Sequence, residues 1–225
     1  SGEPEPALPE LNLSCDPARS APPPQRIWQL TGDQLRATAR ELFAGTMPGP
    51  ELNVVTPSNR TYDGTNADLL RLNREQTQRL IDGVADIARF VASNLEDFVR
   101  CAPTERECFE SFAREWTLRA WREPATDDLV ARLWDIYRIG LESSPADGYE
   151  LVVSAILESP RFIFRTEIGV PDGSGHFRLT SWEVASLLSY VLWSTPPDEE
   201  LRSLAASGRL TEPENMRAQV ERMIR

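Results

Sequence analysis

The chain has no lysine, a single histidine and no long apolar run. Its basic residues are all arginines that lie among acids, and the net charge of -11 argues against nucleic acid and anionic membrane surfaces as partners. A single histidine excludes a three-histidine zinc site. Because no apolar stretch approaches the roughly 20 residues that cross a bilayer, we expect no transmembrane segment.

Several catalytic and cofactor motifs are also missing. The sequence has no Cys-x-x-Cys-His segment for c-type haem, no glycine-rich phosphate loop and no Gly-x-Ser-x-Gly nucleophile elbow. Its carboxylates stand mostly at expected helix starts and on polar faces, which does not favour paired acid–base catalysis. We therefore predict no catalytic residue, no cofactor-binding residue and no metal ligand in this chain.

What the sequence does contain is a series of helix signals. Thr31, Asn73, Thr104, Thr180 and Thr211 are each followed three residues later by Gln or Glu, which is the spacing of a capping box. Apolar residues recur at steps of three and four after these starts. We predict an all-α fold of one or more helix bundles, with helices over residues 31–44, 73–98, 104–123, 126–141, 147–158, 180–192, 198–208 and 211–225.

The same spacing predicts which side chains face inward. After Thr180 they are Val184, Leu188, Val191 and Leu192, while the segment 147–158 is expected to be an apolar helix through Leu151, Val152, Ile156 and Leu157. No segment alternates between polar and apolar residues over the length of a strand, although residues 162–164 can form a short extended piece.

Proline and glycine mark the boundaries of the chain's parts. Residues 1–26 are a proline-rich linker, and residues 46–68 are a long irregular connection. We expect one helical domain over 27–168 and the start of a second over 169–225, truncated because its last helix has no stop signal. The polar opening of the chain is typical of a mature terminus after removal of a targeting segment, or of a lipoprotein tether.

The three cysteines allow two interpretations. All three can be reduced, buried thiols, as in a cytosolic protein. Alternatively, Cys101 and Cys108 form a disulfide, since they flank a break at Pro103 and can meet across a helix–turn–helix, whereas on one helix they would be about 10 Å apart. Closing so short a loop contributes about 2.5 kcal/mol by the chain-entropy relation. Cys15 is then either free or paired with sequence outside this chain.

Three kinds of side chain are candidates for binding. His176 lies in a glycine-flanked loop, where a solvated polar role competes with that of a ligand. Arg161 and Arg165 can bind an anionic group or form ion pairs with neighbouring helices. The tryptophans can form a carbohydrate platform, but four of them fit inward helix faces: Trp116, Trp134, Trp182 and Trp193.

Three stretches of the chain resemble segments of one family. Leu118–Pro124 is similar to its Arg-Arg-Ala-Tyr-Arg-Arg-Pro, and Ser159–Glu167 to its Ser-Pro-Arg-Phe-Leu-Phe-Arg-x-Glu. Thr180–Leu210 contains counterparts of its Leu-Ser-Tyr-Phe-Leu-Trp and Pro-Asp-Asp-Glu-Leu segments. The family is the large secreted group of uncharacterised multidomain proteins associated with planctomycete-type cytochrome c domains, which is also common in myxobacteria.

The resemblance covers residues 100–225 well and 27–99 weakly, and Glu123 and Leu187 stand where the family commonly has arginine. It implies an exported, redox-associated parent protein whose c-type haem is bound in a C-terminal part that this chain lacks. It carries no catalytic residue over to this chain.

We therefore expect a non-catalytic helical scaffold of a periplasmic or extracellular electron-transfer protein, which is either free or lipid-anchored. Its expected partners are downstream C-terminal domains of the same protein, with a separate protein partner as a further option. The alternative is an extracytoplasmic binding module for polysaccharide or a protein partner, with no redox role. A third reading is a hydrolase or oxidase whose site is completed by sequence outside this chain.

Overall fold

The computed structural model describes residues 25–44, 46–53 and 73–225. Three features expected from the sequence lie wholly or mostly outside these residues: the linker 1–26, Cys15 and most of the connection 46–68. The described part is mostly helical with minor short strands, which confirms the predicted fold class.

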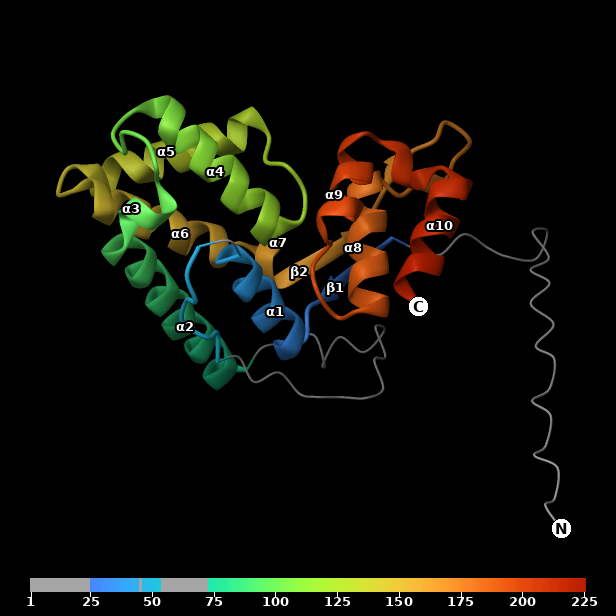
Figure 1. The fold of residues 1–225 in the computed structure, drawn as a ribbon, viewed down its shortest axis with the longest axis horizontal. Coiled ribbons are helices and arrows are strands. Elements are labelled where there is room, and N and C mark those ends of the chain that lie inside the picture. Colours follow the sequence, from blue (N-terminus) through green and yellow to red (C-terminus); the bar gives the residue numbers. More distant parts are fainter. Residues whose placement is uncertain (1–24, 45, 54–72) are drawn as a thin grey trace, which may run out of the picture.

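The helices form two groups at opposite ends of the molecule, with α1, β1 and β2 between them (Figure 1). The first group comprises α2 to α7. The second comprises α8, α9 and α10 with a 3-10 turn, η1. Their bounds are α1 Gly32–Leu42, α2 Arg74–Ser93, α3 Leu95–Phe98, α4 Arg106–Trp121, α5 Asp127–Leu141, α6 Pro145–Leu157, α7 Pro160–Ile163, α8 Ser181–Leu192, α9 Glu199–Ala206, η1 Arg209–Thr211 and α10 Pro213–Met223.

Three of the five predicted capping boxes are confirmed, at Thr31, Asn73 and Thr180. In each, the cap side chain accepts from the backbone N–H three residues on, and that residue's side chain accepts from the cap N–H. These paired bonds satisfy N–H groups that the first turn of a helix leaves without partners.

The other two predicted boxes are wrong. Thr104 lies in a turn closed by the bond from Glu105 N–H to the Ala102 carbonyl, so Glu105 takes the cap position of α4. The hydroxyl of Thr211 is bonded to the Gly208 carbonyl within η1, and α10 begins two residues later, with proline in its first turn. In both places the residue predicted as the helix cap takes part in a local turn and does not cap the helix.

Four short strands were not predicted. Strands β1 (Arg26–Gln29) and β2 (Phe164–Glu167) pair antiparallel, with Ile27 opposite Thr166, and β3 (Val170–Pro171) pairs with β4 (Phe177–Arg178). The piece expected to be extended at 162–164 is helical as far as Ile163, and only Phe164 begins a strand. Strands of two to four residues are too short for alternation to be recognised.

The buried side chains form two clusters. The larger core gathers residues from Leu30, just after β1, to Phe162 of α7, together with Tyr190 of α8, and it contains the fully buried rings of Phe109, Tyr137 and Tyr149. The smaller core lies among α8, α9, η1 and α10, and its buried members are Val184, Ala185, Leu201, Ala205, Leu210 and Met223.

Some side chains expected to face inward are exposed. Val191 is 62% exposed and Leu192 38%, while Leu188 packs partly buried against the smaller core; in the apolar helix α6, Leu151 is 40% exposed. Helices α6 and α8 carry apolar residues around much of their circumference, so periodicity alone does not identify the face that is buried.

Candidate functional site

The end of α4 provides the centre of the candidate site. Arg122 follows the last helical residue with a φ of 63°, a left-handed conformation that is uncommon for a residue other than glycine. Its side chain is 3% exposed. The guanidinium donates to the carbonyls of Ala120 (2.8 Å), Phe162 (3.3 Å), Phe164 (2.8 Å) and Arg161. Arg122 thus ties the end of α4 to α7 and the start of β2.

Helix α8 joins this centre through Tyr190. The Arg122 guanidinium lies 5.7 Å from the centroid of the Tyr190 ring, a cation–π distance. The hydroxyls of Tyr190 and Thr38 are 2.7 Å apart, and Gln34 of α1 donates to the Tyr190 carbonyl at 3.4 Å. Three helices far apart in the sequence, α1, α4 and α8, therefore meet at one arginine–tyrosine pair.

Beside this pair lies an open groove with a volume of about 610 Å³. It is bounded by the end of α4, by α7, by the β1–β2 ribbon and by the first turns of α8. Most of its lining is apolar. Its lining residues are Ile27, Trp121, Arg122, Glu123, Pro160, Arg161, Phe164, Arg165, Thr166, Ile168, Trp182, Glu183 and Ser186.

The two arginines singled out in the sequence both line this groove, and both form ion pairs. Arg161 pairs with Glu123 and lies 5.7 Å above the Trp121 ring. Arg165 is 9% exposed and donates to Glu167 at 2.5 Å. Because Arg165 lines this groove and also a second pocket on the other side of the β1–β2 ribbon, it lies between the two.

Glu183 of α8 also lines the groove. Its carboxylate accepts from the N–H groups of Ile168 (2.8 Å), Gly169 (3.0 Å) and Thr180 (2.9 Å). Burial by itself would raise the pKa of Glu183, but these hydrogen bonds to its charged form outweigh burial and lower the pKa. The residue therefore stays ionised while fixing the link between β2 and α8.

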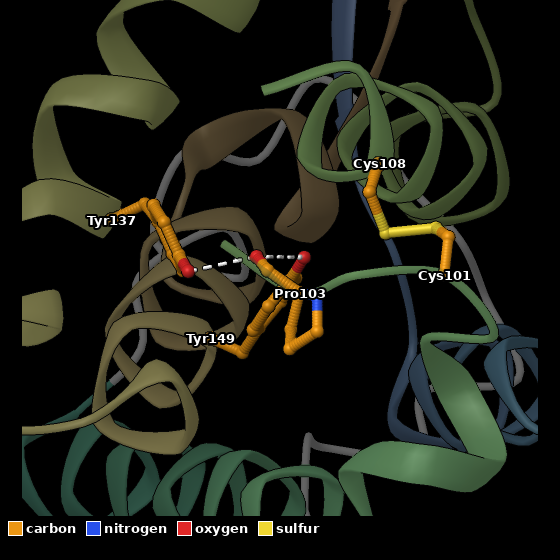
Figure 2. The surroundings of a disulfide bond; sticks show 5 residues. All are labelled: Cys101, Pro103, Cys108, Tyr137 and Tyr149. Carbon is orange, nitrogen blue, oxygen red and sulfur yellow. Dashed lines mark hydrogen bonds between the residues drawn. A yellow bond between two sulfur atoms is a disulfide. The ribbon is translucent and has the colours of Figure 1, made fainter. Parts of the chain in front are cut away.

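The disulfide lies at the other end of α4. Cys101 and Cys108 are bonded, with their Cα atoms 5.8 Å apart, as the helix–turn–helix interpretation of the sequence expects. Inside the closed loop, the Pro103 carbonyl accepts from the hydroxyls of both Tyr137 (2.8 Å) and Tyr149 (3.2 Å) (Figure 2). Burial raises the pKa of both tyrosines, and the nearby Tyr137 raises that of Tyr149 further.

Comparison with known families gives two partial matches and no annotated activity. Residues 108–167 match the family model PSD5, a protein of unknown function (DUF1595), and residues 179–225 match PSD4, a protein of unknown function (DUF1592). Both are planctomycete-type domains of unknown function. No curated protein and no solved structure matches the chain significantly.

The two matched regions meet at the arginine–tyrosine pair. Arg122 and the carbonyls that it binds lie in the PSD5 match, and Tyr190 lies in the PSD4 match. All three stretches that carry the family resemblance supply a partner to this contact: Leu118–Pro124, Ser159–Glu167 and Thr180–Leu210.

The remaining candidate residues lie elsewhere. His176 is exposed in the turn between β3 and β4, where its N–H donates to the Asp172 carboxylate at 3.2 Å. Trp116 is buried in the larger core, while Trp134, Trp182 and Trp193 are partly buried against one of the cores. Over residues 25–44, 46–53 and 73–225, no group of three or more His, Cys, Asp and Glu side chains is placed to hold a metal ion, and no helix has the length and apolar character needed to cross a membrane.

Sequence reasoning missed Arg122 as the centre of the site. The sequence placed Leu118–Pro124 at the end of a predicted helix and in a family-like segment, without a role for each arginine. The available signal was an arginine directly before Glu123-Pro124 at a helix end, where unpaired carbonyls accept from cations. That signal does not indicate which further carbonyls the guanidinium reaches.

Proposed function

We propose that this chain is a non-catalytic helical scaffold of an exported protein that transfers electrons through a haem-bearing part of the same protein. The observation that carries the proposal is the contact of Arg122 with three family-like segments. Its N–H groups are engaged by backbone carbonyls, and its charged plane packs on Tyr190. The segments that resemble the family thus hold the two matched regions together.

Export is supported by the disulfide. Structural disulfides persist in oxidising compartments, such as the periplasm or the outside of the cell. The electron-transfer part of the proposal rests on the resemblance to proteins associated with planctomycete-type cytochrome c domains.

The test uses the natural protein purified from the cells that make it. The proposal expects it in the periplasmic or extracellular fraction, or in the membrane fraction released by lipase if it is lipid-anchored. We expect a Soret band and a reversible reduction of the haem. A protein without haem would contradict the electron-transfer role, and a cytoplasmic protein would contradict export.

A peptide map of the same unreduced sample tests the disulfide separately. The expected result is a linked peptide pair containing Cys101 and Cys108, which reduction separates. Alkylation of both thiols without a reductant would contradict the disulfide and remove the main structural support for export.

The open groove favours a second candidate, an extracytoplasmic binding module for polysaccharide or a protein partner with no redox role. An apolar groove with a few polar groups, placed between two cores, has the character of a ligand site. This candidate expects a natural protein without haem that retains a polysaccharide or partner through the groove.

A further inference from the structure

The groove exposes apolar side chains that the fold leaves uncovered. Ile27 of β1 is 55% exposed and Ile168, just after β2, is 40% exposed, and both line it together with the partly buried Trp182. The groove volume, about 610 Å³, falls within the range of roughly 300–1,000 Å³ that small-molecule sites occupy. Covering these side chains with an apolar ligand would remove their surface from water.

The charges at the groove favour an anion. Three arginines and two glutamates line it, in a chain whose overall net charge is -11. Glu123 is paired with Arg161, and Glu183 accepts from backbone N–H groups. Arg165 is paired with Glu167, which lies outside the lining. Arg122 is bound to carbonyls and has no carboxylate partner among the described residues.

Arg161 is the side chain best placed to receive the anionic group. It is 48% exposed, and its single ion pair uses Nη1, so no described residue accepts from Nε or Nη2. A guanidinium presents two parallel N–H groups to a carboxylate, and the edge bearing Nε and Nη2 offers that arrangement.

We propose that the groove binds a small amphiphilic carboxylate. The apolar body lies against Ile27, Ile168 and Trp182, and the carboxylate accepts from Arg161. This inference goes beyond the scaffold role and does not depend on it. A sugar ring stacked on Trp121 fits less well, since the Arg161 guanidinium already lies over that ring. A cationic head group would be repelled at the exposed edge of Arg161, where a carboxylate is attracted.

The direct test is isothermal titration of the full chain with three ligands of equal chain length: octanoate, octanamide and octylammonium. We expect saturable one-to-one binding of octanoate, about tenfold tighter than octanamide because a hydrogen bond to a charged group is the stronger one. Octylammonium should bind most weakly. Equal affinity for octanoate and octanamide, or no saturation with any of the three, would overturn the proposal.

Two pairs of variants locate the site. Ile27→Glu places a negative charge in the groove and should abolish octanoate binding, while the control Ile139→Glu, at a position that is 65% exposed on α5, should leave it unchanged. Arg161→Gln should reduce octanoate affinity to that of octanamide. Its control, Arg132→Gln, breaks an exposed ion pair with Asp128.

Circular dichroism confirms that each variant is folded, and the exposed position of Arg161 keeps its variant informative if Ile27→Glu unfolds. If Arg161→Gln retains the full preference for octanoate, the anionic group binds elsewhere and the proposal is wrong. The haem test of the scaffold proposal is unaffected by either result.

Discussion

The larger and the smaller core are stabilised in different ways. The larger core has fully buried aromatic rings in edge and stacked contacts, and the disulfide closes the loop at the start of α4. The smaller core contains aliphatic side chains, alanines and Met223, and its described buried members include no aromatic ring. Stability from buried area therefore favours the larger core by a wide margin.

Polar contacts supplement the smaller core. Arg222 pairs with Asp198 at 2.7 Å, and the Trp193 indole donates to the Met223 carbonyl at 2.9 Å. The contacts that connect it to the rest of the molecule include those of Tyr190, the Arg202–Glu41 pair at 2.9 Å, and the bonds from the Ile168 and Gly169 N–H groups to Glu183. Ion pairs that are partly exposed contribute little. We infer that the stability of the smaller core depends on its docking against the larger one.

The largest expected effect comes from the larger core. Phe109 is fully buried against Trp134, Tyr137 and Tyr149, so Phe109→Ala should lower the free energy of unfolding by about 3–5 kcal/mol. Urea titration followed by circular dichroism measures the loss. The matched control is Phe177→Ala at a 52% exposed position, which should cost less than about 0.5 kcal/mol. Equal effects would contradict the assignment of the core.

Arg122→Ala removes one of the contacts that connect the two cores. It leaves four carbonyls without this donor and deletes the contact with Tyr190, so we expect a loss of about 3 kcal/mol. Calorimetry should show one transition in the parent protein and two in the variant, with the smaller core melting first. Arg132→Ala, which breaks an exposed ion pair, is the control. A single transition in the Arg122 variant would mean that other contacts couple the cores.

Trp193→Ala tests the smaller core directly. The ring is partly buried, and its indole N–H is bonded to the end of α10, so we expect a loss of about 2 kcal/mol. His176→Ala, in an exposed turn, should change stability by less than about 0.5 kcal/mol. Thermal melts of both variants beside the parent suffice. A stable Trp193 variant beside a collapsed His176 variant would reverse the roles given to these residues.

Acid should act first on the smaller core. Burial by itself would raise the pKa of Asp198, but its hydrogen bonds with Arg222 and Leu201 outweigh burial and lower the pKa, and the pKa of Glu183 is also lowered. A carboxyl whose pKa is lowered by folding stabilises the fold above its unfolded pKa of about 4, and this stability is lost as the pH falls through the folded value.

The larger core should respond to alkali, although hydrogen bonds with Ser143 and Ser144 also lower the pKa of the partly exposed Asp147 at the start of α6. Burial raises the pKa of Tyr137 and Tyr149, so their contribution is complete below about pH 10 and is lost as the pH rises through the folded values. Calorimetry of the Arg122→Ala variant at acid, neutral and alkaline pH resolves the two transitions. A larger loss for the larger core in acid would contradict this assignment.

The sequence predicted the helices well where a local signal and the tertiary structure agree. At Thr31, Asn73 and Thr180 the cap bonds form within four residues, so their pattern is readable in the chain. Thr104 and Thr211 have the same spacing in the sequence, but each takes part in a local turn and does not cap the helix that follows. The turn at Thr104 lies within the loop closed by the disulfide.

The candidate site was predicted only in part. Arg161 and Arg165 were recognised as possible anion ligands or ion-pair members, and the structure pairs both with glutamates while placing them at one groove. Arg122 and Tyr190 were not linked, because their contact joins positions 68 residues apart and has no local signature. The two strands at the groove were not predicted for the same reason, because β1 and β2 are far apart in the sequence and pair only in the folded chain.

Native-state hydrogen exchange, read peptide by peptide in the parent protein, tests the central claim most directly. If the smaller core depends on docking, the amides of α8, α9 and α10 should exchange through openings of lower free energy than those of α4, α5 and α6. In the Arg122→Ala variant the gap between the two groups should widen. Equal protection of both groups in the parent, unchanged by the variant, would contradict the account.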